Sequence, residues 1–288
     1  MFNYYCYRLG QFIALTLPLK LGYIVAVFLA DLHYLFAFRD RRYVKGNLRA
    51  IFPDKTDKER RRICRMVFCN FAKYLVDFFR FQKIDKEYIS KNIKLENLHY
   101  FDQALARGKG VVVLTAHLGN WELGGVVLAQ LGYPFWVVAL PHKEKKVNDF
   151  FDGQRASKGI KVIAMGKAVR SCIQQFRNNN MVALVGDRDF TASGSVIDFF
   201  NKPTLFPQGP AALHFMTGAA IVPGFMLRNP DDSFTLRIEK PLEFTPTLDK
   251  KKDLVGLITL YKNIFEDYIR KYPEQWYAFR QFWVKGQL

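Results

Sequence analysis

Cysteine is scarce in this chain of 288 residues, which contains four, at positions 6, 64, 69 and 172. No C-x2-C pair occurs, and the density is far below that of a domain stapled by disulfides. We therefore expect reduced thiols, most of them buried, in a catalytic part that faces the cytosol. Metal-ligand spacing is absent as well, because His142 and His214 stand alone, so we expect no metal site and interpret both as structural.

An uninterrupted apolar run of about 20 residues, long enough to cross a bilayer as a helix, is also missing. Residues 1–38 are strongly apolar, but Pro18, Lys20 and Asp31 interrupt them. They have neither the basic start nor the small-residue cleavage site of a signal peptide. The basic cluster at 39–42 follows directly. We expect a pair of short helices lying in the membrane interface, with one tilted span as the alternative.

Acidic residues are outnumbered, since 26 Asp and Glu stand against 43 Lys and Arg, and the formal net charge is +17. This balance indicates an anionic partner. Half of the residues are hydrophobic and 27 are Phe, while zinc fingers, RNA-recognition motifs and basic heptads are lacking. We therefore expect an anionic membrane surface or acidic substrate as partner, and no nucleic acid.

The hydrophobic pattern predicts an α/β fold with a mostly parallel central sheet flanked by helices. Predicted strands are 93–95, 111–116, 135–139, 161–163, 182–185, 221–225 and 234–238. Predicted helices are 100–106, 121–131, 147–157, 167–178, 210–217 and 254–271. Before them, helical patterns cover 42–52 and, after a capping box of Thr56 and Glu59, about 57–81. We expect one structural unit made of a membrane-associated segment (1–38), a helical region (39–92) and an α/β domain (93–288).

The stretch from Gly110 to Glu122 is the most informative. A buried strand ends at His117, a turn with Gly119 follows, and Asn120 is a plausible N-cap of the next helix. On one continuous helix His117 and Glu122 would lie about 140° apart, since each residue advances roughly 100°. They face each other only if the chain bends between them, and then the carboxylate orients the imidazole as a general base. The alternative is a capped helix beside a half-buried structural histidine.

A second strand ends in Asp187, Arg188 and Asp189. In a parallel sheet these residues reach the same edge as His117, where open α/β sheets build their sites. Arg188 then faces an anion and the acids order it; the alternative is a salt-bridge cluster. We do not expect Asp187 and Asp189 to face the same ligand. Arg155 ends a predicted helix and is interpreted as a cation that complements the helix dipole.

Two later segments carry weaker indications. Residues 195–203 form a hairpin-like strand, and Gly209 and Pro210 open a helix whose N-terminus is a ready anion site. The segment 272–283, rich in aromatic residues, is interpreted as an aromatic cap on the core.

In combination, these blocks resemble a family. Thr115-Ala-His-Leu-Gly-Asn-Trp-Glu122 resembles the H-x4-E block of the lipid A biosynthesis (lauroyl/myristoyl-type) acyltransferases, in the lysophospholipid acyltransferase superfamily. Further blocks agree in order, at 47–53, 186–189, 199–210, 217–223 and 273–280. The resemblance covers nearly the whole chain. Asp187-Arg188-Asp189, where many lipid A enzymes have Asp-Gln-Asp, is closer to phosphatidylinositol mannoside acyltransferases and leaves the acceptor open.

The resemblance implies transfer of an acyl chain from acyl-carrier protein or acyl-CoA to a hydroxyl of a membrane glycolipid, at the cytoplasmic face of the inner membrane. It implies that His117 is the base and Glu122 its partner, with Arg155, Asp187 and Arg280 supporting the site. We expect these three residues, Asn120 and Arg188 to bind substrate. No further cofactor is implied. The first acceptor we expect is a lipid A precursor; the alternatives are another glycolipid or a lysophospholipid, or a non-catalytic basic membrane protein.

Overall fold

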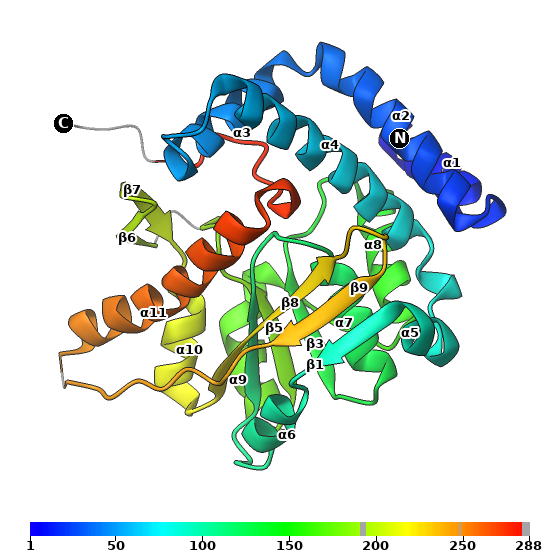
Figure 1. Cartoon of the computed structure of the whole chain (residues 1–288). Coiled ribbons are helices and arrows are strands. Elements are labelled where there is room, and N and C mark those ends of the chain that lie inside the picture. Colours follow the sequence, from blue (N-terminus) through cyan, green and yellow to red (C-terminus); the bar gives the residue numbers. More distant parts are fainter. Residues whose placement is uncertain (191–193, 248, 284–288) are drawn as a thin grey trace.

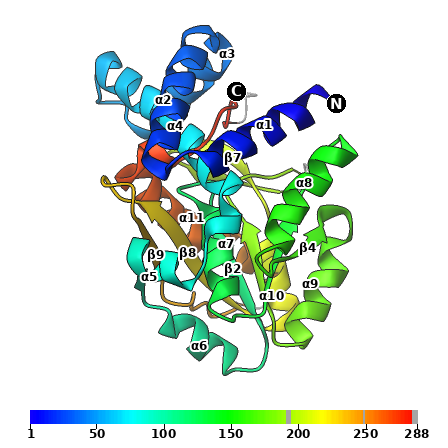
Figure 2. The same cartoon turned by 90° about the vertical axis from the view of Figure 1, so that its right-hand side faces the viewer.

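The structure is a computed structural model that describes residues 1–190, 194–247 and 249–283. Four N-terminal helices, which we call the helical cap, arch across one end of an α/β layer (Figure 1). The cap consists of α1 (Phe2–Thr16), α2 (Leu19–Phe36), α3 (Phe38–Ile51) and α4 (Asp57–Phe79). Figure 2 shows the same arrangement from the side, with the N-terminus beside α8.

Local sequence explains where the cap helices begin and end. Pro18 lies at the break between α1 and α2, and proline supplies no backbone N–H inside a helix. The predicted capping box opens α4: the Thr56 side chain accepts from the Glu59 N–H, and the Glu59 carboxylate accepts from the Thr56 N–H. The cap thus contains two apolar helices within residues 1–38, of which α2 has 18 residues, and the predicted long helix.

A mixed sheet of seven strands forms the centre of the molecule, in the order β1-β9-β8-β2-β5-β3-β4. Its strands are β1 (Ile93–Glu96), β2 (Val111–Thr115), β3 (Phe135–Ala139), β4 (Lys161–Ala164), β5 (Met181–Val185), β8 (Ala220–Arg228) and β9 (Phe234–Ile238). All neighbouring pairs are parallel except β8 and β9, which confirms the mostly parallel sheet. A separate hairpin consists of β6 (Ser195–Phe199) and β7 (Lys202–Phe206).

Helices cover both faces of this sheet, each with its own apolar core. They are α5 (Lys86–Asn92), α6 (His99–Leu105), α7 (Trp121–Gln130), α8 (Lys145–Ala156), α9 (Ala168–Arg177), α10 (Gly209–Thr217) and α11 (Lys250–Lys271). Short 3-10 turns are η1 (Phe81–Lys83), η2 (Met165–Lys167) and η3 (Pro273–Gln275). Residues of α6, α7 and α8 share one core, which also takes in Ala14 and Tyr23 of the cap. Residues of α9, α10 and α11 share the other.

The predicted elements are present, but several ends differ: α3 starts at Phe38 and not at 42, and β8 continues to Arg228 and not only to 225. Helix α11 starts at Lys250 and not at 254, because Asp249 caps it by accepting from the N–H groups of Lys251 and Lys252. The pattern of apolar residues does not reveal this start, because the first helical residues are lysines and charged residues do not contribute to an apolar period. The short helix α5 was not predicted; Asp85 caps it by accepting from the Tyr88 N–H.

The sheet opens at one point that matters for function. The connection after β3 leads to α8 on one face, whereas the chain after β5 leads to the hairpin and α10 on the other. Pairing between β3 and β5 stops at Val137 and Ala183, although the outer partners of both strands continue. Open α/β sheets have their ligand crevice at such a switch point.

Candidate active site

His117 lies just past the carboxyl end of β2, a strand buried along its whole length. The turn after it needs glycine: Gly119 has φ +66°, and a Cβ there would lie 2.0 Å from the carbonyl oxygen of Met226. Asn120 then caps α7 by accepting from the Leu123 N–H at 3.1 Å, as predicted. The chain therefore bends between His117 and the helix.

The carboxylate that orients His117 is Asp187. Nδ1 of His117 lies 2.6 Å from Oδ1 of Asp187, and the Asp187 side chain is fully buried. A carboxylate can only accept, so Nδ1 carries the hydrogen and Nε2 is left with its lone pair. This is the tautomer that a general base needs.

Asp187 is held as an anion by several neighbours. Its Oδ2 accepts from the indole N–H of Trp276 at 3.0 Å, and Nε of Arg188 lies 3.7 Å away. Burial by itself raises the pKa of Asp187, but the charges of His117 and Arg188 outweigh it and hold the pKa well below its ordinary value. Burial lowers the pKa of His117 below its ordinary value, against the opposing effect of Asp187. The histidine is thus neutral near pH 7 and ready to accept a proton.

Glu122 has a different partner from the one predicted. Its carboxylate accepts two hydrogen bonds from Arg155, from Nη2 at 2.5 Å and from Nε at 3.0 Å. Arg155 also donates to Asp152 at 3.1 Å, and the Arg155 and Glu122 side chains are only 10% and 11% exposed. The bend places the first turn of α7 over α8, so Glu122 pairs with Arg155 of that helix. The position beside His117 is occupied by Asp187, which follows β5, the neighbour of β2 in the sheet. Whether Glu122 takes part in the chemistry stays a prediction.

Of the other predicted site residues, Asn120 is buried, and its side chain donates to Asp77 while it caps α7. Arg188 lies beside Asp187 and donates to the carbonyl of Tyr277, and the Arg280 guanidinium lies 5.3 Å from the ring centre of Phe190. Both cations lower the pKa of His117, so they lie close enough to act on it. Asp189 instead accepts from the Gly194 N–H at 3.2 Å. On an extended strand positions 187 and 189 would share a face, but the chain bends at Asp187 and the two acids take different partners.

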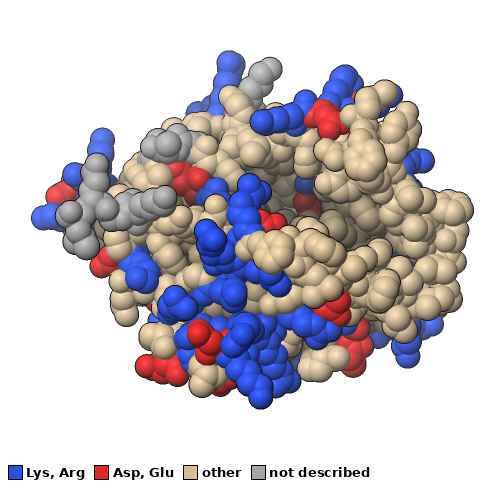
Figure 3. Space-filling view, turned by 90° about the horizontal axis from the view of Figure 1, so that it is seen from above, with Lys and Arg blue, Asp and Glu red and all other residues tan. Residues whose placement is uncertain are grey.

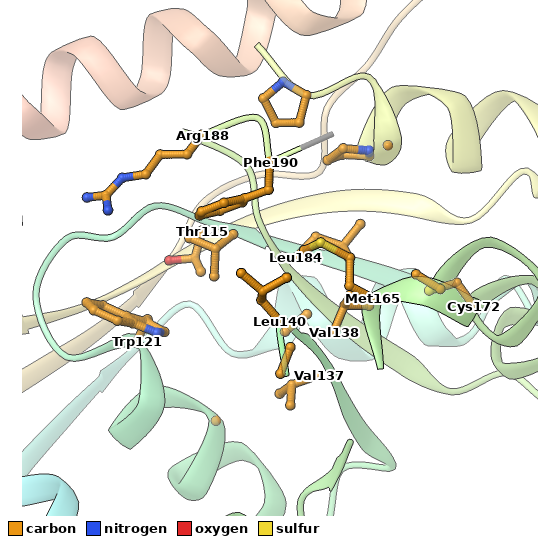
Figure 4. A pocket seen from close by; sticks show the side chains of 18 of the residues that line it. Thr115, Trp121, Val137, Val138, Leu140, Met165, Cys172, Leu184, Arg188 and Phe190 are labelled. Carbon is orange, nitrogen blue, oxygen red and sulfur yellow. The ribbon is translucent and has the colours of Figure 1, made fainter. Parts of the chain in front are cut away.

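A cavity of about 560 Å³ begins at His117 and enters the opening between β3 and β5. Its walls are mostly apolar; Val137, Val138, Leu140, Met165, Cys172 and Leu184 are among them. In Figure 4, Trp121 and Arg188 lie at one end of this cavity, and Met165 and Cys172 lie at the other. The volume and lining suit a long apolar ligand with one reactive end at the histidine.

Sequence reasoning missed three side chains here. Trp276 had been assigned to an aromatic cap, Trp121 packs edge-on to the His117 ring at 5.2 Å, and Thr115 lines the cavity. The Thr115 hydroxyl is buried and has no hydrogen-bond partner among the described residues. Only Thr115 had a usable signal, because position 115 shares a strand face with 117. The described residues also contain no group of three or more His, Cys, Asp or Glu placed to hold a metal ion.

Fold and site together define an α/β protein with a histidine–carboxylate pair at the mouth of an apolar cavity. Comparison with known families gives the particular class: the model of the bacterial lipid A biosynthesis acyltransferases matches residues 2–285. The chain belongs to this family and is an acyltransferase.

Individual relatives fall into two kinds. A phosphatidylinositol mannoside acyltransferase of Mycolicibacterium smegmatis is 28% identical over 227 residues, which are 77% of this chain and 72% of that protein. One of Mycobacterium tuberculosis is 33% identical over 160 residues, 54% of this chain and 51% of that protein. A lipid A biosynthesis acyltransferase of Haemophilus influenzae is 22% identical over 241 residues, 83% and 74% of the two chains. The chain is therefore an acyltransferase of the lipid A and phosphatidylinositol mannoside type.

Proposed function

We propose that this enzyme moves a fatty acyl chain from an acyl thioester, carried by acyl-carrier protein or coenzyme A, to a sugar hydroxyl of an anionic membrane glycolipid. The observation that carries the proposal is the His117–Asp187 pair at the mouth of the apolar cavity. A lipid A precursor is the first acceptor we expect. The higher identity to the phosphatidylinositol mannoside enzymes supports a mannosylated phospholipid as the second candidate.

His117 is the base in this mechanism. Nε2 takes the proton of the acceptor hydroxyl as its oxygen attacks the thioester carbonyl carbon. Asp187 holds Nδ1–H and stabilises the imidazolium that forms. When the tetrahedral intermediate collapses, the C–S bond breaks and the proton on Nε2 passes to the leaving thiolate. The products are the ester and a free thiol, and the enzyme returns to its starting state.

The negative charge that develops on the oxygen of the tetrahedral intermediate is stabilised by hydrogen-bond donors or cations that are in position before the reaction. Arg155, a cation near the site, is not available as such a donor, because its guanidinium is bound to Glu122 and Asp152. The unused Thr115 hydroxyl and the Arg188 guanidinium both line the cavity near His117. We assign the oxyanion to them, together with those N–H groups of the first turn of α7 that Asn120 does not cap.

The apolar cavity receives the acyl chain. Each methylene that leaves water for such a site gains about 0.8 kcal/mol, so a long chain binds far better than a short one. The splayed ends of β3 and β5 let the chain pass between the strands while its thioester stays at His117.

The cap supports membrane attachment. Helix α2 is long and apolar enough to cross a membrane by length and composition. However, it packs along α4 through Gly22, Tyr23, Ala26 and Ala30, and Asp31 pairs with Arg65 of α4 at 2.5 Å. A span would pull the charged helix α4 into the bilayer, which is costly. We therefore propose that α1 and α2 lie in the interface, on the cytoplasmic face of the inner membrane, with their exposed apolar side chains in the lipid.

Two measurements test this function. Purified protein with acyl-carrier protein or acyl-CoA donors should acylate a glycolipid acceptor, and His117→Ala should lower that rate by about 10³-fold or more. Mass spectrometry of lipids from cells with and without the protein identifies the acceptor. If His117→Ala keeps the wild-type rate of acyl transfer, His117 is not the base. If fatty acid is released at the full rate without an acceptor, the enzyme is a hydrolase.

A further inference from the structure

The C-terminal segment is fastened to the His117 turn by backbone hydrogen bonds. Tyr277 N–H donates to the carbonyl of His117, and Gly119 N–H donates to the carbonyl of Gln275, both at 2.9 Å. Leu118 and Trp276 form an isolated antiparallel bridge. Residues about 160 positions apart in sequence thus form one small structural unit.

Trp276 places its indole inside this unit, at the carboxylate of Asp187. The residue is 3% exposed, and its N–H donates to Oδ2 of Asp187 at 3.0 Å. The other oxygen, Oδ1, is the one that faces Nδ1 of His117. The ring of Phe282, 4.9 Å from that of Trp276, helps to fix the indole plane.

The nearest cation does not replace this bond. Nε of Arg188 lies 3.7 Å from Oδ2, beyond hydrogen-bond range, and it has no hydrogen-bond partner among the described residues. The guanidinium donates through Nη2 to the carbonyl of Tyr277 instead. The hydrogen bonds that Asp187 accepts from described side chains therefore come from His117 and Trp276.

We propose that Trp276 is a positioning residue of this site, whose indole N–H fixes the Asp187 carboxylate and through it sets the orientation and basicity of His117. This rests on the proposed function, in which His117 is the base. A side chain in a mere aromatic cap would contribute packing alone, whereas a hydrogen bond to an anion also draws charge away from the oxygen that faces the histidine.

The sign of the effect follows from that charge. Without the N–H, more of the Asp187 charge stays on Oδ1, and the imidazolium form of His117 is favoured. Among the described residues, the charged groups outside this pair that act on it are Arg188 and Arg280, and Trp276→Phe changes neither charge. Loss of the indole N–H should therefore raise the pKa of His117 and move the acid limb of the rate profile to higher pH.

The test compares Trp276→Phe with Trp283→Phe in the full-length protein. Trp283 is the matched control, since it lies in the same aromatic group but its indole N–H has no hydrogen-bond partner among the described residues. Histidine titration is followed by NMR, which is tractable because the chain has five His, and a His117→Asn variant identifies the signal. Trp276→Phe should raise the pKa of His117 by about half a unit or more, and lower kcat about tenfold.

Each outcome decides something. A folded Trp276→Phe protein with the wild-type His117 titration and pH profile overturns the proposal, as does an equal shift in Trp283→Phe. If Trp276→Phe does not fold, replacing Trp276 by benzothienylalanine keeps the ring shape and removes only the N–H. The titration needs no turnover, so a wild type that transfers no acyl group refutes the proposed function separately.

Discussion

At the scale of single residues, the site depends on which carboxylate pairs with His117 and which with Arg155. Asp187 reaches His117, and Glu122 reaches Arg155, because β5 and α8 each bring one partner to the bend after β2. The two acids thus have separate tasks, one acting on the histidine and one on the wall of the cavity.

Exchanging each acid for its amide separates these tasks. Asp187→Asn should lower kcat on the order of 10³- to 10⁴-fold, because an amide stabilises the wrong tautomer of His117. Glu122→Gln should instead lower the free energy of unfolding by about 3 kcal/mol, because buried Arg155 loses its bidentate partner. Rate assays and denaturant unfolding of both variants check this, and the assignment is wrong if Glu122→Gln shows the larger loss of kcat at unchanged stability.

At the scale of elements, one buried polar cluster joins the cap to the catalytic turn. Asp77 of α4 accepts from the Asn120 side chain at 2.9 Å, and also from Tyr23 of α2 and Arg228 of β8. Asp77 and Arg228 are 3% and 8% exposed. Burial raises the pKa of Asp77, while Arg228 and the hydrogen bonds oppose it. The N-cap of α7 therefore depends on how α2 and α4 are seated.

This cluster predicts a graded loss of stability. Asp77→Asn leaves Arg228 without its buried counter-charge and should cost about 3–5 kcal/mol in unfolding free energy. Tyr23→Phe removes one hydrogen bond to a charged group and should cost about 2 kcal/mol. Chemical denaturation of the two proteins in the same detergent gives both values, and equal effects would show that Arg228 does not need the charge of Asp77.

The cavity between the elements predicts a change of chain-length preference. Cys172 of α9 is buried and lines the end of the cavity away from Trp121 and Arg188 (Figure 4). Cys172→Phe should fill that end and shift the preferred donor to shorter acyl chains, by roughly fourfold in affinity for each methylene excluded. Competition between donors of different length measures this. Cys172→Ser, which keeps the volume, is the control; an unchanged preference in Cys172→Phe would place the chain elsewhere.

At the scale of the whole molecule, charge and apolar surface are arranged around the cap. Figure 3 looks down on the cap from above and shows Lys and Arg gathered on one side of a hollow, beside a broad uncharged surface. Exposed apolar side chains of α1 and α2 include Phe2, Phe12, Ile24 and Phe28, each at least 65% exposed. Basic and apolar surface side by side is what an anionic lipid interface binds.

Membrane binding should therefore fail when the apolar face of α2 is charged. The double variant Ile24→Glu/Phe28→Glu should bind anionic vesicles at least tenfold more weakly, because it no longer buries two large side chains. Leu131→Glu changes an exposed apolar residue at the far end of α7 and serves as control. Vesicle sedimentation at low and high salt separates the apolar from the electrostatic contribution to binding, since salt weakens only the attraction between basic side chains and anionic lipid. Undiminished binding of the double variant would remove α2 from the interface.

The sequence by itself determined the elements and the likeness to a family. Periods of two and 3.6 gave the strands and helices, capping residues gave the start of α4 and α7, and ordered blocks gave the reaction class, because these patterns depend on near neighbours along the chain. Position 117 at the end of a buried strand was enough to single out the histidine.

The tertiary structure decided the partners. Asp187 lies 70 positions from His117, and Trp276 lies 89 from Asp187, so no local period relates them. Which carboxylate faces the imidazole depends on strand order, on the bend at Gly119 and on the return of the C-terminal segment to the same edge. Spacing in sequence limits the directions in which a side chain can point, whereas its contacts are set by what the rest of the fold packs around it.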